Sequence, residues 1–263
     1  MSFNYASNHI LITGASSGIG EHASYEAAKS GANLILCARR LDKLLEVKRQ
    51  CEALGATSVN VFLVDIGDPE SIDALLIQLE KKNLPVDVLI NNAGFGHSEK
   101  FLDTDFDRIL SLFKVNVLGL MYLTQRLAIK MLEQSGGQII NVASLAGHVS
   151  TPNYAVYGAT KGAVISFSNA LRMELKAHNV QVTVVNFGPV DTPFFDEIKG
   201  NRKEKAENSP FTLTVQQAGK TVNNVIGTKK REVNRPVLLG LGAKIYTFAP
   251  QLVDYILIKY YNE

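Results

Sequence analysis

The chain has 263 residues, of which 46% are hydrophobic and 20% are charged, and its formal net charge is +2. This composition excludes a disordered chain, and the length suits one large α/β domain with a sizeable core. So small a net charge gives no support for a nucleic-acid-binding protein.

The first predicted strand, 9–13, is apolar and runs directly into a glycine-rich turn, which a helix follows through about Lys29. Glycines allow a tight turn and close backbone approach, and the N–H groups of a helix start bind a pyrophosphate. The spacing, Gly-x-x-x-Gly-x-Gly, differs from the usual fingerprint, so an ordinary glycine turn is the alternative. We expect a dinucleotide-phosphate site made by Thr13, Gly14, Ser16, Ser17, Gly18, Ile19 and Gly20.

The second predicted strand, 33–38, indicates which nucleotide binds. Sites for NAD normally place an acidic residue about 20 positions after the glycine turn, where it binds the ribose 2′-hydroxyl. Ala38 holds that place here, followed by Arg39 and Arg40. Two cations before a helix that begins near Asp42 are unfavourable at its positive dipole end, and a 2′-phosphate between them removes the conflict. We therefore predict NADP(H), with a pair of solvated arginines as the alternative.

The rest of the chain continues the alternation of strands and helices. Strands are predicted at 59–64, 86–90, 138–142 and 180–185, with a candidate seventh strand at 236–239. Helices are predicted from 68–69, over about 103–134 and over about 153–178. This pattern predicts an α/β fold, a Rossmann-type doubly wound parallel sheet of about seven strands with helices on both faces. We expect a single domain over 1–263.

Tyr157 and Lys161 lie four positions apart and share one face of the predicted helix. A neighbouring cation lowers the pKa of a phenol, and general acid–base catalysis needs a pKa near the working pH. Taken alone, the pair is better read as a solvated helix face. Ser144 follows the fifth strand, where a hydroxyl can stabilise charge that develops on a carbonyl oxygen.

Several motifs in this order make the chain resemble the short-chain dehydrogenase/reductase family, in its NADP(H)-preferring type. The match runs from about 9 to about 239. It consists of the glycine turn, Asp65, the segment Asn91-Asn92-Ala93-Gly94, Asn116, Ser144, Tyr157-x-x-x-Lys161 and the segment 188–192. The resemblance implies a Rossmann-type fold, a nicotinamide cofactor and carbonyl/alcohol redox chemistry.

The resemblance also implies roles for single residues. It places Asp65 at the adenine amino group and Ile66 on the ring, although Asp65 competes with a simple role in a turn. Asn92, Ala93 and Gly94 are expected at the adenosine ribose, whereas Asn91 is equally suited to an architectural role. Lys161 is expected to hold the nicotinamide ribose. The carboxamide is expected to contact Val190 and Thr192.

Phe187 is a departure from the family, which usually has proline there, and it either alters the pocket wall or packs in the core. The expected reaction is reduction of a small-to-medium apolar ketone or aldehyde. Tyr157 donates the proton, Ser144 holds the carbonyl, Lys161 lowers the tyrosine pKa, and Asn116 is either a structural cap or part of a proton relay. A non-catalytic NADPH sensor and a nucleotide-sugar epimerase or dehydratase are the alternatives, and no metal site is expected.

Two further regions are assigned from composition. Residues 193–230 are expected to form a substrate loop, with a charged stretch at 201–207 that resembles a lid. The apolar tail, 241–263, is expected to be a helix that packs on the domain or at a subunit interface, with membrane-surface contact less favoured. A homo-oligomer, dimer or tetramer, is expected. Cys37 and Cys51 lack metal or redox spacing and residues 1–8 lack a secretory pattern, which predicts a cytoplasmic protein.

Overall fold

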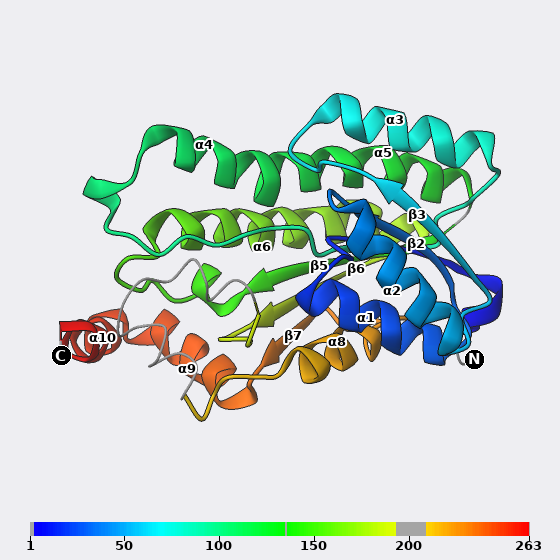
Figure 1. Ribbon diagram of the computed structural model, residues 1–263. Coiled ribbons are helices and arrows are strands. Elements are labelled where there is room, and N and C mark those ends of the chain that lie inside the picture. The colour runs from blue at the N-terminus through cyan, green and yellow to red at the C-terminus, as the bar shows by residue number, and fades with distance from the viewer. Residues whose placement is uncertain (1–2, 135, 193–208, 263) are drawn as a thin grey trace.

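The structure is a computed structural model that describes residues 3–134, 136–192 and 209–262. Within these ranges seven strands form one parallel sheet in the order β3-β2-β1-β4-β5-β6-β7 (Figure 1). The strands are β1 (His9–Thr13), β2 (Asn33–Ala38), β3 (Ser58–Leu63), β4 (Val88–Asn91), β5 (Gly137–Ser144), β6 (Val180–Phe187) and β7 (Glu232–Arg235). The order reverses direction between β1 and β4, which is where a doubly wound sheet binds its ligand.

Helices cover both faces of the sheet because successive strand residues point to opposite sides. Ile10 and Ile12 of β1 join one apolar cluster, with α1 (Gly18–Lys29), α2 (Leu41–Ala53) and α8 (Val215–Asn223). Leu11, between them, joins a second cluster, with α3 (Pro69–Lys81), α5 (Leu120–Glu133) and the end of α6 (Ala155–Leu175). The predicted fold class, a Rossmann-type α/β fold, is therefore confirmed.

The predicted helical segment over 103–134 is present from Phe106 to Glu133, but it is not a single α-helix. The structure has a 3₁₀ turn, Phe101–Asp103, then α4 (Phe106–Phe113), a π-helical segment, Lys114–Gly119, and only then α5. Two contacts explain the wider turn: Asn116 turns inward to bond the neighbouring loop, and Gly119 passes so close to the carbonyl of Ile66 that a Cβ would overlap it. Such π-helical turns occur often at functional sites.

The predicted seventh strand at 236–239 is also wrong. Strand β7 ends at Arg235, and α9 (Val237–Phe248) starts two residues later. Val233 to Arg235 pair in register with Val185 to Phe187. Pro236 has no N–H with which to continue that ladder, and it serves instead as the N-cap of α9. The apolar run that resembled a strand is thus the first turn of a helix.

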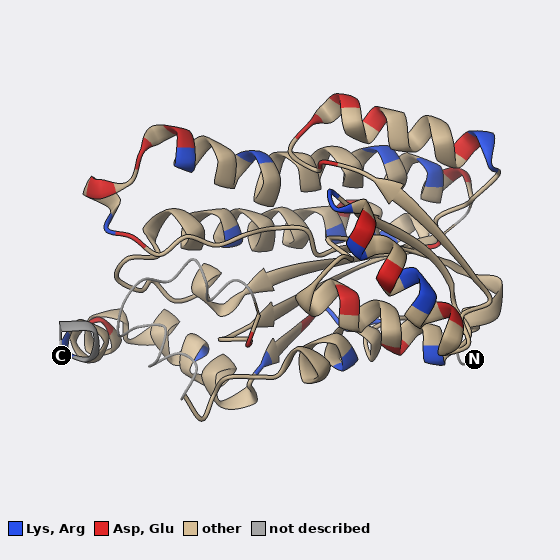
Figure 2. Ribbon diagram, in the orientation of Figure 1, with Lys and Arg blue, Asp and Glu red and all other residues tan. Residues whose placement is uncertain are grey.

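The tail is helical, as expected, but it forms two helices, α9 and α10 (Pro250–Asn262). Charged residues lie along the helices and loops while the strands are almost free of them, as Figure 2 shows. Among the described helices, none has both the length and the apolar character needed to cross a bilayer. Most of the predicted substrate loop, 193–208, lies outside the described residues, and with it the charged stretch at 201–207.

Candidate active site

In the turn between β1 and α1, three glycines lie at positions that a larger residue does not fit well. Gly14 and Gly18 have φ values of 65° and 60°, in the left-handed region that favours glycine. A Cβ at Gly20 would overlap the carbonyl oxygen of Gly14, so the turn closes only without side chains. Ser17 is the N-cap of α1 and makes no side-chain hydrogen bond to that helix. The first N–H groups of α1 therefore face a small cradle, which fits a phosphate.

Arg40 reaches this turn from the end of β2. Its Nη2 atom donates to the hydroxyl of Ser17 at 2.9 Å and lies 3.3 Å from that of Ser16. The same group lines a hollow of about 730 Å³ between the turn and α2, together with Lys43 and Arg49. A guanidinium held on two serine hydroxyls beside a phosphate cradle suits a second phosphate. Arg39, its neighbour, is exposed.

Thr13 joins the glycine turn to the end of β4. Its hydroxyl accepts hydrogen bonds from the N–H groups of Asn92 and Ala93, both at 3.0 Å. The side chain of Asn92 in turn donates to the Thr13 carbonyl at 3.0 Å. Asn91 bonds Thr124 and Asn141, each at 2.8 Å, inside the domain. These bonds support the architectural interpretation of Asn91, and a direct contact of Asn91 with the coenzyme stays a prediction.

Asp65 and Ile66 both make contacts within the protein itself. Asp65 follows β3 and its Oδ1 accepts from the N–H of Gly67 at 2.8 Å, which is the role in a turn. Ile66 is only 6% exposed and belongs to the second apolar cluster. Contacts of these two residues with an adenine stay predictions.

Three side chains meet at the carboxyl ends of β5 and β6. The hydroxyls of Ser144 and Tyr157 are hydrogen-bonded to each other, and Lys161 Nζ lies 5.8 Å from the centre of the Tyr157 ring. Ser144 also donates to the carbonyl of Phe187 at 3.1 Å. Lys161 is 6% exposed and donates to the carbonyl of Val142 at 3.2 Å. The sequence-predicted catalytic residues are thus brought together.

Burial dominates the electrostatics of this group. Burial raises the pKa of Tyr157 to about 12, and the hydrogen bond with Ser144 only partly opposes it. Burial also lowers the pKa of Lys161 to about 8. Desolvation is the largest influence on the pKa of Tyr157 in the protein by itself, and the expectation that Lys161 lowers this pKa stays a prediction. A further positive charge is needed to bring the phenol near neutrality.

Asn116 belongs to the π-helical segment and is 1% exposed. Its amide exchanges two hydrogen bonds with the backbone of Phe95, at 3.0 and 2.9 Å, and a third reaches the hydroxyl of Thr160 at 3.2 Å. A Cβ at Gly94 would lie 2.9 Å from Asn116 Oδ1 and 3.6 Å from Lys161 Nζ. Asn116 is therefore a structural tie beside Lys161, and its part in a proton relay stays a prediction.

The chain after β6 returns to the glycine turn. Thr192 approaches Gly18, whose added Cβ would lie 3.4 Å from the threonine methyl. Val190 is 7% exposed and pairs with Leu213. Phe187 is 3% exposed and belongs to the first apolar cluster, so its side chain packs in the core.

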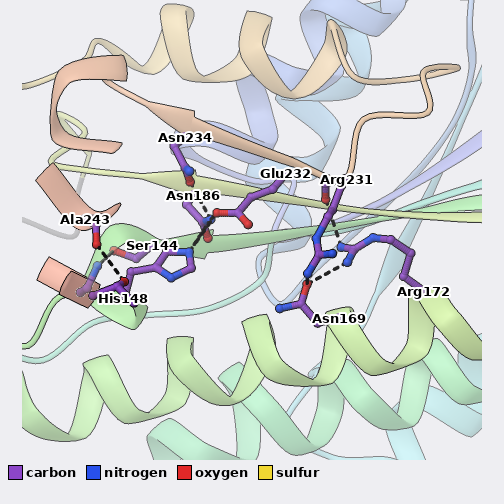
Figure 3. A network of polar contacts seen from close by, with 11 residues as sticks. Ser144, His148, Asn169, Arg172, Asn186, Arg231, Glu232, Asn234 and Ala243 are labelled. Atoms are coloured by element: carbon purple, nitrogen blue, oxygen red, sulfur yellow. Dashed lines mark hydrogen bonds and ion pairs between the residues drawn. The ribbon is translucent and has the colours of Figure 1, made fainter. Parts of the chain in front are cut away.

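Sequence reasoning missed a polar network beside Ser144, drawn in Figure 3. His148, four residues after Ser144, pairs with Glu232 of β7 at 3.0 Å. The amide of Asn186 donates to the same Glu232 oxygen at 2.9 Å and to Asn234 at 2.8 Å. The pKa of Glu232 is lowered to about 2, chiefly by the hydrogen bond from His148. No sequence signal identifies this pair, because it depends on β6 and β7 being neighbours. Among the described residues no cluster of metal-ligand type occurs.

Comparison with known proteins identifies the family of the chain. The short chain dehydrogenase family model matches residues 8–203. The NADP-dependent 3-hydroxy acid dehydrogenase of Schizosaccharomyces pombe is 37% identical over 201 residues, 76% of this chain and 78% of the relative. The 3-dehydrosphinganine reductase of Danio rerio is 36% identical over 193 residues, which are 72% of this chain but only 58% of that protein.

Solved structures show the same relationship. The closed form of serine dehydrogenase complexed with NADP+ superposes with a TM-score of 0.78 at 29% identity, covering 88% of this chain and 95% of its own. A short-chain dehydrogenase from Sphingobium yanoikuyae in complex with NADPH has a TM-score of 0.81 at 24% identity, covering 94% and 95%, which supports the fold. The chain belongs to the short-chain dehydrogenase family of oxidoreductases.

Proposed function

We propose that this oxidoreductase transfers a hydride from NADPH to an apolar ketone or aldehyde. The observation that carries the proposal is that Ser144, Tyr157 and Lys161 lie together at the carboxyl edge of the same parallel sheet whose strand β1 leads into the glycine turn. Bound NADPH supplies the hydride, and its oxidised ring supplies a positive charge. The cofactor is NADP(H), which agrees with Arg40 at the glycine turn and with NADP in the names of relatives.

The three polar side chains divide the work on the substrate carbonyl. The hydroxyl of Ser144 turns from the carbonyl of Phe187 to donate to the substrate carbonyl oxygen, and it stabilises the charge that develops there. Tyr157 protonates the same oxygen, which suits a phenol whose pKa burial keeps high until a cation is near. Lys161 stabilises the resulting phenolate, and its lowered pKa near 8 lets it exchange protons close to neutral pH. Asn116 holds the loop that follows β4 against α6, next to Lys161.

The substrate proposal rests on related proteins. The names of two relatives, a 3-hydroxy acid dehydrogenase and a 3-dehydrosphinganine reductase, both place the reacting oxygen at carbon 3. We therefore expect carbonyl compounds with an apolar chain, and among them 3-oxo compounds first. The reaction is proposed to take place in the cytoplasm, which the two free, buried thiols of Cys37 and Cys51 suit.

A homo-oligomer forms part of the proposal. Phe106 and Leu110 of α4 are 68% and 40% exposed, and Leu118 in the following π-helical segment is 58% exposed. Large apolar side chains that are this exposed and this close together favour a second copy of the chain as partner. Light scattering of the purified protein, and of a Phe106→Asp variant, tests this face.

Turnover on a substrate panel tests the proposed reaction. NADPH consumption is followed against short and long ketones, aldehydes, 3-oxo esters and quinones, with NADH in parallel. We expect oxidation of NADPH by apolar carbonyl compounds and weak use of NADH. NADPH binding without oxidation by any panel member would favour a sensor and contradict the proposal.

A further inference from the structure

Helix α9 presents a continuous apolar stripe to solvent. Its members are Val237, Leu238, Leu241, Ile245 and Phe248, with exposures of 56, 62, 50, 55 and 88%. At 3.6 residues per turn these five positions fall within an arc of about 100°. Large apolar residues gathered on one side of a helix mark an interaction surface, whereas scattered ones do not.

The other side of α9 is fixed on the domain, so the stripe cannot turn inward. Gly240 lies so close to β7 that a Cβ there would stand 2.6 Å from that of Asn234. Ala243 is 6% exposed, and an added Cβ on Gly188 would lie 3.0 Å from Leu239. Leu239, Gly240 and Ala243 thus face the domain, and the five residues of the stripe are left outside.

Helix α10 adds further exposed apolar residues, among them Ile258, which is 53% exposed on another side of the helix. It packs on α9 and lies at the edge of the molecule, beyond α9, in Figure 1. Leu252, Tyr255 and Ile256 are 60, 69 and 55% exposed and share one side of the helix. Both ribbons are largely tan in Figure 2, where charged residues are coloured. The two stripes together form what we call the tail surface, residues 237–259.

The charges of the tail surface indicate what covers it. Lys244 lies at the edge of the α9 stripe, and Lys259 lies within the α10 stripe; both are exposed. Asp254, the one acidic residue between 237 and 259, is half-buried on the other side of α10. A second copy packed on this surface would bury cations against the same apolar stripe without a partner. Anionic lipid phosphates at a bilayer surface give both lysines a partner while their stems stay in the apolar layer.

We propose that the tail surface binds the interface of an anionic lipid bilayer, with α9 and α10 lying in its plane. Helix α9 also packs beside the turn that follows Ser144, so binding would hold the rim of the catalytic site near the lipid. This last point rests on the proposed function and assigns the substrate class, an apolar carbonyl compound that partitions into the bilayer. The binding itself does not depend on the reaction.

Sedimentation with vesicles tests the proposal. The purified full-length chain is mixed with vesicles of phosphatidylcholine alone or with phosphatidylglycerol added, and the bound fraction is measured. We expect binding to the anionic vesicles that weakens as salt is raised. Replacing Leu241 and Ile245 together by Asp should weaken vesicle binding at least about tenfold. Removing the charge of Lys244 or Lys259 should cost about fivefold each.

Matched changes on α3 provide the control. Ile77 is 52% exposed, and Lys81 follows one turn later, on a helix far from the tail surface in Figure 1. Ile77→Asp and Lys81→Gln should leave vesicle binding unchanged. No binding to anionic vesicles by the wild-type chain would overturn the proposal. So would a dimer, seen by light scattering, that Leu241→Asp dissociates.

The reaction is measured separately with a water-soluble ketone. The Leu241→Asp/Ile245→Asp variant should reduce this ketone at the wild-type rate, and such a result shows that the variant is folded. Loss of vesicle binding with intact turnover supports the lipid surface. If the wild-type chain binds vesicles but oxidises NADPH with none of the carbonyl compounds, the proposed function fails while the lipid proposal stands.

Discussion

The two ends of the chain use apolar side chains in opposite ways. In β1, Ile10, Leu11 and Ile12 are completely buried between two layers of helices, whereas in α9 Phe248 is 88% exposed. The first region finds all its packing partners within the chain, so its sequence pattern specifies its structure. The tail surface packs small residues inward and large ones outward, so its pattern makes sense only with a partner outside the chain. Changes in the first region should therefore affect catalysis and stability, and changes to the exposed side chains of the tail surface should affect neither.

Apart from the loss of the Tyr157 hydroxyl, the largest expected effect comes from Lys161→Met. Removing the cation beside Tyr157 should lower kcat/KM for carbonyl reduction by about 10³-fold, because general acid–base catalysis by a tuned group contributes this much. Steady-state NADPH oxidation measures it. Lys176→Met, at the exposed end of the same helix, should change the rate less than twofold; an equal loss in both variants would contradict the account.

The same variant tests the cost of burying a cation. Folding lowers the pKa of Lys161 from 10.5 to about 8, so the unfolded chain binds the proton more tightly and stability rises as pH increases from about 8 to 10.5. Lys161→Met removes that cost but also the bond to Val142, and we expect Tm at pH 7 to rise by about 3 °C. A Tm below that of the wild type would show that the lysine stabilises the fold.

Arg40→Ala is expected to have the next largest effect. Loss of a charge-assisted bond to the 2′-phosphate should raise KM for NADPH by about 10- to 100-fold and leave KM for NADH nearly unchanged. Arg49 lines the same hollow and is the matched control. A similar rise for both coenzymes in Arg40→Ala would assign the arginine to the turn structure and not to the phosphate.

Glu232→Gln should have a smaller effect, visible in acid stability. The pKa of Glu232 is lowered from 4.5 to about 2, so the wild type holds this stabilisation above pH 4.5 and loses it as pH falls toward 2. Urea unfolding at several pH values should show that the variant is less stable than the wild type at pH 6 and equally stable near pH 2. Glu46→Gln, which breaks an exposed ion pair with Lys43, should change the free energy of unfolding little at any pH. A gap between wild type and Glu232→Gln that persists at pH 2 would contradict this origin.

The smallest effect is expected for the tail. Each described side chain of α10 up to Lys259 is at least partly exposed. Ending the chain at Ala249 should therefore change Tm by less than about 3 °C and leave turnover of a water-soluble ketone within about twofold. Ending it at Pro236 removes Ala243 and the rest of α9, and should lower Tm clearly. Equal losses from both truncations would show that α10 belongs to the core.

The sequence predicts the regions in which local rules and packing agree. The glycine turn, Arg40 and the pair Tyr157 and Lys161 could be found because each follows from spacing within one or two elements. Features that depend on contacts between distant segments could not. The π-helical segment depends on Asn116 meeting the loop after β4, and the end of β7 depends on its register with β6.

Two further features depend on the finished fold. His148 and Glu232 are separated by 84 residues and meet only across the sheet. The raised pKa of Tyr157 follows from how deeply the phenol is buried, which a motif does not record. The sequence indicates that the tail is apolar and helical. Which side of α9 faces outward depends on the packing of Gly240 and Ala243 against the domain, and this packing cannot be predicted from the sequence.

Tyr157→Phe tests the central claim most directly, with coenzyme binding and turnover measured on the same protein. We expect NADPH to bind with a Kd within about twofold of the wild type, while kcat for ketone reduction falls at least about 10³-fold. The ring of Tyr154 lies edge to face with that of Tyr157, with 6.4 Å between the ring centres. Tyr154→Phe is therefore the matched control and should keep most activity. Near-normal turnover by Tyr157→Phe would contradict the assignment of the phenol as proton donor.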